Sequence, residues 1–202
     1  MANSIKLNRI IKTLLVSDLL YLTSIGFMAP IFAIFVTDQI RGGSIEIVGI
    51  AMGFHWLAIA LLEIPFARFF DKHVGEHDDF IGMLAGAVLV SIASMLYAFA
   101  SDAWHVYALQ GLTGVGVALN HPTWTAIFNR HVDRDQIAFD WGVAGVIYAV
   151  SMAITSGASG FLVEAFGFKI FFVIVGAVSL LGALILLFIR QQLRVSVMTR
   201  VS

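Results

Sequence analysis

The chain has 202 residues and is 59% hydrophobic and 12% charged, about half the charged fraction of a typical soluble domain, which excludes a soluble globular protein. The composition therefore predicts an integral membrane protein, with the lipid bilayer as a partner. The absence of cysteine excludes a disulfide framework, an iron–sulfur cluster and thiol catalysis, and the net charge of −1 argues against nucleic acid as a partner.

Six apolar segments are long enough to cross a hydrocarbon layer ~30 Å thick, which takes about 20 helical residues. The first is too long for the apolar region of a signal peptide, so we expect an uncleaved span. The segments predict an all-α membrane protein with a single domain over residues 1–202. The expected helices cover roughly residues 10–36, 46–67, 80–100, 104–129, 137–163 and 169–189.

The basic residues predict the direction of these helices. Ten of the twelve Lys and Arg residues fall in the two terminal segments and in the second and fourth connections. Arg41 and Lys169 alone fall in the other three connections. Because basic residues are enriched on the cytoplasmic side, both termini are expected in the cytoplasm, in a multi-pass protein of the cytoplasmic (inner) membrane.

Polar residues are shared unevenly among the expected helices. The third helix, and the sixth over residues 170–189, contain no charged residue, His, Asn or Gln, so they can face lipid, whereas the other four are expected to face protein or a cavity. The bare helix is the third of each half, which predicts a three-plus-three repeat. The first and fourth helices each place a Gly before a Pro, in the segments 26–35 and 116–128, and such paired interruptions are typical of transporter binding sites.

These features together resemble the N-terminal half of a major facilitator superfamily transporter. The segment "ARFFDKHVGE" is similar to the family's motif between helices 2 and 3; it keeps Asp71 and has Lys72 at the Arg position. "YALQGLTGVGVA" keeps the Gln and the glycines of the helix 4 motif, although Tyr107 occupies the position of its Arg. "GASGFLVEAFGF" is similar to the family's helix 5 segment without its Pro.

The resemblance implies a secondary transporter that moves a small solute by alternating access between two six-helix halves. Only one half is present, so a second six-helix half is expected as a partner. We predict a homodimer through the second and fifth helices; a hetero-partner half and a piece of a longer chain are the alternatives. The contact is expected along the small residues Gly142, Gly145, Gly157 and Gly160 of the fifth helix.

Asp18 and His121 are the leading candidates for a site inside the membrane. They are expected at similar depth on helices that line the cavity in the resembling fold, where a carboxylate beside a His can couple solute movement to protons. A static hydrogen-bonded pair is the alternative. Solute contacts are also expected from five further polar or aromatic residues, with packing between helices as the alternative: Tyr21, His55, Asn120, Trp124 and Tyr148.

A gate is expected at the cytoplasmic side. By resemblance, Asp71 and Lys72 would contact a helix start of the other half, while Glu63 and Asp140 would join Arg68 or Arg130 in a network of charges. His73 and His77 have the i, i+4 spacing of a metal site, but Gly75 between them and the solvated surroundings argue against it. No metal, cofactor or catalytic residue is expected.

The sequence leaves two other functions as alternatives. The G-A-S-G segment at residues 157–160 is similar to the nucleophile motif of rhomboid intramembrane proteases, which need a His on a later helix. The last His is His131, so that base is missing. A non-transporting scaffold or assembly protein with the same half-fold is the second alternative. No phosphate-binding loop of the G-x-x-x-x-G-K type occurs, which argues against an ATP-driven pump.

Overall fold

The computed structural model describes residues 7–72, 76–190 and 193 of the chain. These residues form helices and no strand; an isolated β-bridge joins Arg41 to Asp102. The predicted all-α class is therefore confirmed. The helices are α1 (Arg9–Gln39), α2 (Ile45–Asp71), α3 (His77–Leu96) with the 3₁₀ turn η1 (Tyr97–Phe99), α4 (Ala103–His131), α5 (Ile137–Ile185) and η2 (Leu186–Ile189).

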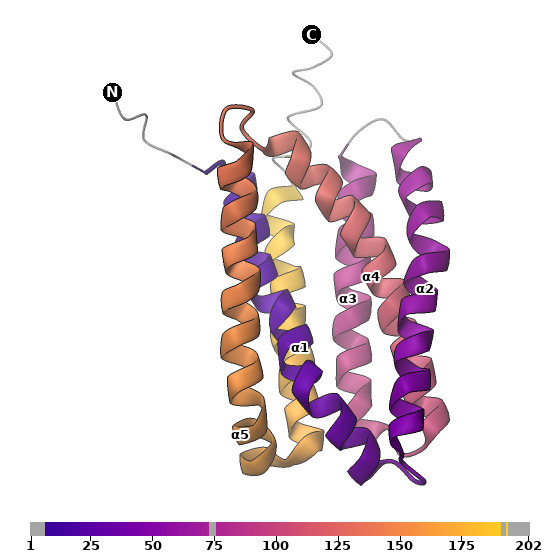
Figure 1. Ribbon diagram of the computed structural model, residues 1–202. Helices are drawn as coiled ribbons and strands as arrows, with labels where there is room; N and C mark the ends of the chain where they lie inside the picture. Colours follow the sequence, from indigo (N-terminus) through magenta and orange to yellow (C-terminus); the bar gives the residue numbers. More distant parts are fainter. Residues whose placement is uncertain (1–6, 73–75, 191–192, 194–202) are drawn as a thin grey trace.

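The long helix α5 is interrupted at Gly167. This residue has φ 75° and ψ 163°, a backbone conformation that glycine adopts without steric cost. The ribbon reverses direction there, so α5 consists of a first arm (137–166) and a second arm (168–185) (Figure 1). The break coincides with the polar stretch that separates the fifth and sixth apolar segments in the sequence.

Within the described residues, four helical segments are long and apolar enough to span a membrane. They are α1, α2, α3 with η1, and α5 with η2, in which both arms count as one segment; α4 is not among them. One end of the bundle, drawn at the top of Figure 1, holds the start of α1, the α4–α5 connection and the end of η2. We call this the basal end. The α1–α2 and α3–α4 connections and the reversal between the two arms of α5 lie at the opposite end.

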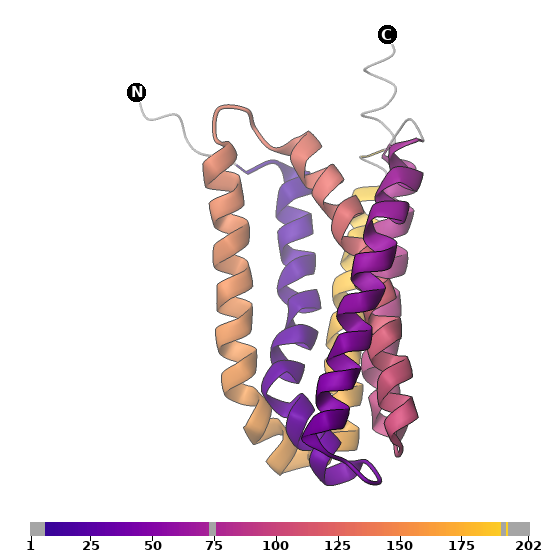
Figure 2. The ribbon, with the colours of Figure 1, turned by 45° about the vertical axis from the view of Figure 1, so that its right-hand side comes forward.

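The helices pack in a chain of neighbours, and two of the apolar clusters between them are larger than the rest. Helix α1 packs mainly on α5, α4 packs on both α2 and α3, and α3 also packs on α5. One cluster joins rings from α1, η1 and the second arm, with Phe35 and Phe172 at 4.7 Å between ring centroids. The other lies at the basal end and includes Leu14, Phe128 and Leu186. Helix α2 and the first arm of α5 stand on opposite sides of the bundle (Figure 2).

Helix α2 continues beyond its predicted end at residue 67. It contains Pro65 and runs to Asp71, so Arg68 and Asp71 lie in helix rather than in a loop. Hydropathy alone ends a helix where apolar residues stop, but the backbone can continue with its internal hydrogen bonds after the side chains become polar. The start of α2 agrees better with the prediction because Ser44 caps it, accepting a bond from the N–H of Ile47 at 3.3 Å.

Candidate solute site

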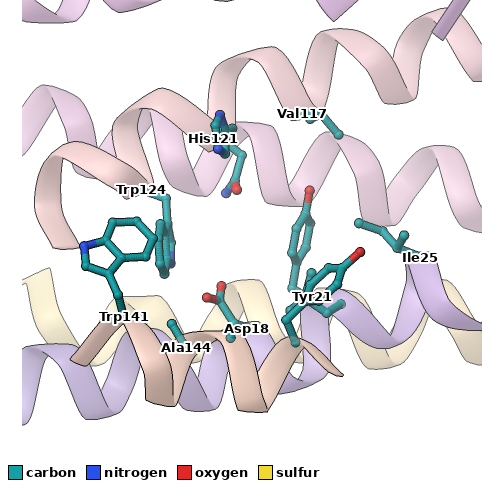
Figure 3. Close-up of a pocket in the computed structure, with 12 residues that line it drawn as sticks. Asp18, Tyr21, Ile25, Val117, His121, Trp124, Trp141 and Ala144 are labelled. Atoms are coloured by element: carbon teal, nitrogen blue, oxygen red, sulfur yellow. The ribbon is translucent and has the colours of Figure 1, made fainter. Parts of the chain in front are cut away.

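A cavity of about 400 Å³ lies between α1, α4 and the first arm of α5. On each helix the lining residues recur every three or four positions, as expected for one face of a helix. Figure 3 shows side chains from the three helices facing one another across this space. The lining residues are Asp18, Tyr21, Leu22, Ile25, Val117, Asn120, His121, Trp124, Trp141, Ala144, Gly145 and Tyr148.

Asp18 is the carboxylate of this cavity. Its neighbour Ser17 donates a hydrogen bond to the carbonyl of Gly182 at 2.8 Å, which turns that side of α1 towards the second arm. Asp18 lies about 100° further around the helix and points into the cavity (Figure 3). None of the described lining residues is Lys or Arg, so the carboxylate faces no permanent positive charge.

Aromatic rings form the wall opposite and beside Asp18. Trp124 stacks on Phe128 with 4.7 Å between ring centroids and meets Trp141 edge to face at 6.0 Å. The indole N–H of Trp124 is buried and faces Asp18, although among the described residues it has no partner at full hydrogen-bond geometry. Tyr21 and Tyr148 line the same space. A carboxylate among aromatic faces is a chemically suitable environment for an organic cation, which can interact with both.

The structure corrects the expected partner of His121. His121 lines the cavity with Asp18, but its Nδ1 lies 2.7 Å from Oε1 of Glu63 on α2. Asn120 donates to the carbonyl of Met83 on α3 at 2.8 Å, which fixes the rotation of α4. The next residue is therefore directed towards α2, and the sequence cannot reveal this rotation.

His121 also lines a second cavity, of about 350 Å³, nearer the basal end between α2, α4 and the start of α3. This second cavity includes the carboxylates of Glu63, Asp71 and Asp79. The Glu63–His121 pair therefore lies where the two cavities share a wall. The sequence predicts neither this pairing nor the position of Asp79.

The expected gate network has different pairings in the structure. Arg130 forms an ion pair with Asp79, and Asp140 is buried and accepts from the backbone N–H of Asp133 at 3.2 Å. Glu63 pairs with His121 instead of Arg68 or Arg130. Lys72 is the C-cap of α2, and neither Lys72 nor Arg68 has an ion pair within the described ranges.

His55, an expected solute contact, does not line the solute cavity. It lies on α2 with its ring edge to face against Trp56, at 5.2 Å, and its buried Nδ1 has no hydrogen-bond partner in the part of the chain that the structure describes. His73 and Gly75, on which the metal interpretation depends, lie outside the described residues. Among the described residues, no group of three or more His, Cys, Asp or Glu side chains is arranged to hold a metal ion.

The sequence predicts most of the cavity but misses part of its third wall. Asp18, Tyr21, Asn120, His121 and Trp124 meet there, as do Gly145 of the expected dimer contact and Tyr148. Trp141 and Ala144 were not expected. Their spacing with Tyr148 is the available signal, because residues 141, 144–145 and 148 share one helix face.

Comparison with known families settles the classification. The family model described as Major Facilitator Superfamily matches residues 14–197, which is most of the chain. The chain belongs to the Major Facilitator Superfamily. The match agrees with the resemblance seen in the sequence, and no curated protein matches the chain.

Membership in the Major Facilitator Superfamily gives the helices a common explanation. The chain is an integral, multi-pass membrane protein with a transporter-type fold, and members of this superfamily are transporters rather than enzymes. The cavity between α1, α4 and α5 is therefore the candidate solute site.

Proposed function

We propose that the chain is a secondary transporter that moves a small organic solute by alternating access. The observation that carries the proposal is the cavity in which Asp18 faces aromatic side chains without a permanent positive charge. A polar group inside a membrane bundle is costly and is usually functional. The carboxylate and rings favour a cationic or amphipathic solute, held by charge attraction and by the faces of Trp124, Trp141 and Tyr148.

We infer that the chain crosses the membrane six times, as one domain with a three-plus-three repeat. The reversal at Gly167 supports counting the two arms of α5 as separate spans. Helix α4 has 29 residues, which is long enough to span a membrane. Its polar residues lower its mean hydropathy, and several of them line the two cavities. Successive connections alternate between the two ends of the bundle, which supports six crossings of the membrane (Figure 1).

A second six-helix half completes the proposed transporter, either as a homodimer or as a hetero-partner. Two features support this. Helix α2 has one buried residue, Ala51, among its 27 residues. Side chains added at Gly142, Gly145, Gly157 or Gly160 of the first arm would meet nothing within 4 Å. Small residues with free space beside them are suited to close contact with another membrane helix.

Proton coupling is the proposed energy source. Asp18 lines the solute cavity, and the Glu63–His121 pair lies between that cavity and the one nearer the basal end. These three groups give a series of titratable sites from the cavity towards the basal end, which we assign to the cytoplasm from the distribution of basic residues. Asp71, Lys72 and Arg68 at the same end of α2 remain the proposed gate against the partner half.

The change Asp18→Asn tests the proposed solute site. Ethidium serves as the probe because it is an aromatic organic cation with its own fluorescence. Binding to the purified protein is expected to weaken about tenfold or more, as when ~1.4 kcal/mol of charge attraction is lost. Uptake driven by a pH gradient in proteoliposomes is expected to be abolished.

The matched control is Asp38→Asn, the same change on the same helix but at an exposed position near the opposite end. This control should bind and transport ethidium as the unmodified protein does. Equal ethidium binding by both variants would contradict the role of Asp18. If the unmodified chain neither binds nor transports any of a panel of small solutes, the scaffold alternative would be favoured instead.

A further inference from the structure

A groove of about 310 Å³ lies at the basal end, between the first turns of α1 and the end of α5 with η2. It is lined by Arg9, Lys12, Thr13, Val16, Ile185 and Phe188. Val16 and Asp18 are two positions apart on α1, or about 200° around the helix. The groove therefore opens on the side of α1 away from the solute cavity, and the proposed transport cycle does not use it.

The two basic residues of the groove have no acidic partner. All Asp and Glu residues of the chain lie within the described ranges. The ion pairs of those ranges involve Arg41, Arg130 and three His residues, and none involves Arg9 or Lys12. Both are exposed at the surface. Two neighbouring cations without a carboxylate form a site suited to an anion from outside the chain.

The walls below these cations are apolar and exposed. On α1 the exposed residues Arg9, Lys12, Val16 and Leu19 follow one another at helical spacing, so the face changes from basic to aliphatic; Val16 is 50% exposed. On the facing helix, Ile185 is partly exposed and Phe188 is 76% exposed. Exposed Val and Phe side chains in a membrane protein are suited to contact with lipid tails.

We propose that this groove binds an anionic phospholipid. The phosphate group would lie between Arg9 and Lys12, and an acyl chain would follow Val16, Ile185 and Phe188 towards the membrane interior. Basic pockets between membrane helices are suited to such headgroups. The aliphatic and aromatic walls favour a lipid over free phosphate, which would use the cations and leave the walls without a ligand.

Native mass spectrometry of the full chain in detergent tests the proposal. The unmodified protein is expected to retain phosphatidylglycerol and to release phosphatidylcholine. In the double variant R9Q/K12Q, phosphatidylglycerol retention should fall about tenfold to thirtyfold, which corresponds to ~1 kcal/mol for each basic residue near a lipid surface. The matched control R134Q/K169Q removes two exposed cations elsewhere and should retain the lipid.

A second variant separates the groove from general surface charge. Val16→Trp fills the groove while it keeps both cations, and its position is exposed, so the fold should be unaffected. Loss of phosphatidylglycerol in this variant supports binding in the groove. Unchanged retention in V16W, equal loss in R134Q/K169Q, or complete displacement of the lipid by inorganic phosphate would each overturn the proposal.

Discussion

Glycines have opposite surroundings on two sides of this bundle. On the packed side, which we define by α3, α4 and the second arm of α5, most glycines lie against the backbone of a neighbouring helix, whereas Gly111 of α4 has free space. The glycines in backbone contact are Gly86, Gly114, Gly116, Gly176 and Gly182. A Cβ added at Gly86 would lie 2.6 Å from the backbone nitrogen of Asn120, and one added at Gly176 would lie 2.7 Å from the carbonyl oxygen of Ser91. These helices approach so closely that no side chain fits between them.

On the open side, which we define by α2 and the first arm of α5, glycines have free space. A Cβ at Gly49 or Gly53 of α2, or at Gly157 or Gly160 of α5, would meet nothing within 4 Å. The same residue type thus has two roles. Where a neighbour is present, glycine allows close packing and stabilises the fold; where no neighbour is present, it leaves a smooth surface for lipid or a partner helix.

The largest effect is expected from alanine substitution on the packed side. Gly86→Ala places a methyl group against the backbone of α4, which cannot move aside as a flexible side chain would. Overpacking of this kind costs about 1–3 kcal/mol, so the melting temperature in detergent should fall by several degrees.

Gly157→Ala on the open side is the matched control. It adds the same methyl group in free space and replaces glycine by a better helix former, so its melting temperature should be equal or slightly higher. If both variants are destabilised equally, the difference between the two sides is not steric.

A cross-linking experiment sharpens the comparison by identifying what covers the open side. The chain has no cysteine, so a single introduced thiol reports on one position. In a homodimer through the first arm, Gly157→Cys, at an exposed position outside the solute cavity, should form an intermolecular disulfide in membranes under mild oxidation. Leu181→Cys, at a 56% exposed position on the second arm, should remain monomeric.

Native mass spectrometry of the unmodified protein provides the second measurement. A dimer by mass, together with cross-linking at position 157 but not at 181, supports the homodimer. A clean monomer that also fails to cross-link at 157 contradicts it and leaves a hetero-partner half as the proposed complement.

Most of the fold is predictable because the membrane imposes it. Hydrocarbon thickness sets the length of apolar segments, and the need to satisfy backbone groups makes them helical. The reversal at Gly167 is visible as the polar stretch around Glu164 and Lys169. The end of α2 was missed because a helix can continue into polar sequence, and the side chains of Arg68 and Asp71 carry no signal of where the backbone stops.

The site was only partly predictable because the sequence does not give helix rotation. Asp18 and Asn120 are visible as polar residues within segments expected to span the membrane, and the structure brings both to the cavity. The partner of His121 depends on which face α4 turns towards α2, and that orientation is fixed by the contact of Asn120 with α3. A contact between distant helices leaves no local pattern in either segment.

The smallest effect is expected at the end opposite the basal end, where the α1–α2 connection contacts the α3–α4 connection. Arg41 follows α1, and its guanidinium donates to Asp102 before α4 at 2.7 Å, while its backbone N–H donates to the carbonyl of Ser101 at 2.9 Å. The hydrogen bond from Arg41 lowers the pKa of the Asp102 carboxyl from its ordinary value of 3.8. The folded state therefore favours the ionised carboxylate.

The sign of the pH dependence follows from this lowered pKa. The stabilisation from the Arg41–Asp102 pair is present above the ordinary Asp pKa of 3.8 and is lost as the pH falls through the lowered value in the folded protein. Asp102→Asn removes the charge but keeps a good N-cap for α4. The variant should therefore melt slightly below the unmodified protein at neutral pH, and the difference should vanish in acid and shrink in high salt, because the pair is exposed to solvent.

Asp135→Asn, which changes an exposed carboxylate at the basal end, is the control and should melt like the unmodified protein. A difference for D102N that persists unchanged in acid would contradict a contribution from the ionised Arg41–Asp102 pair.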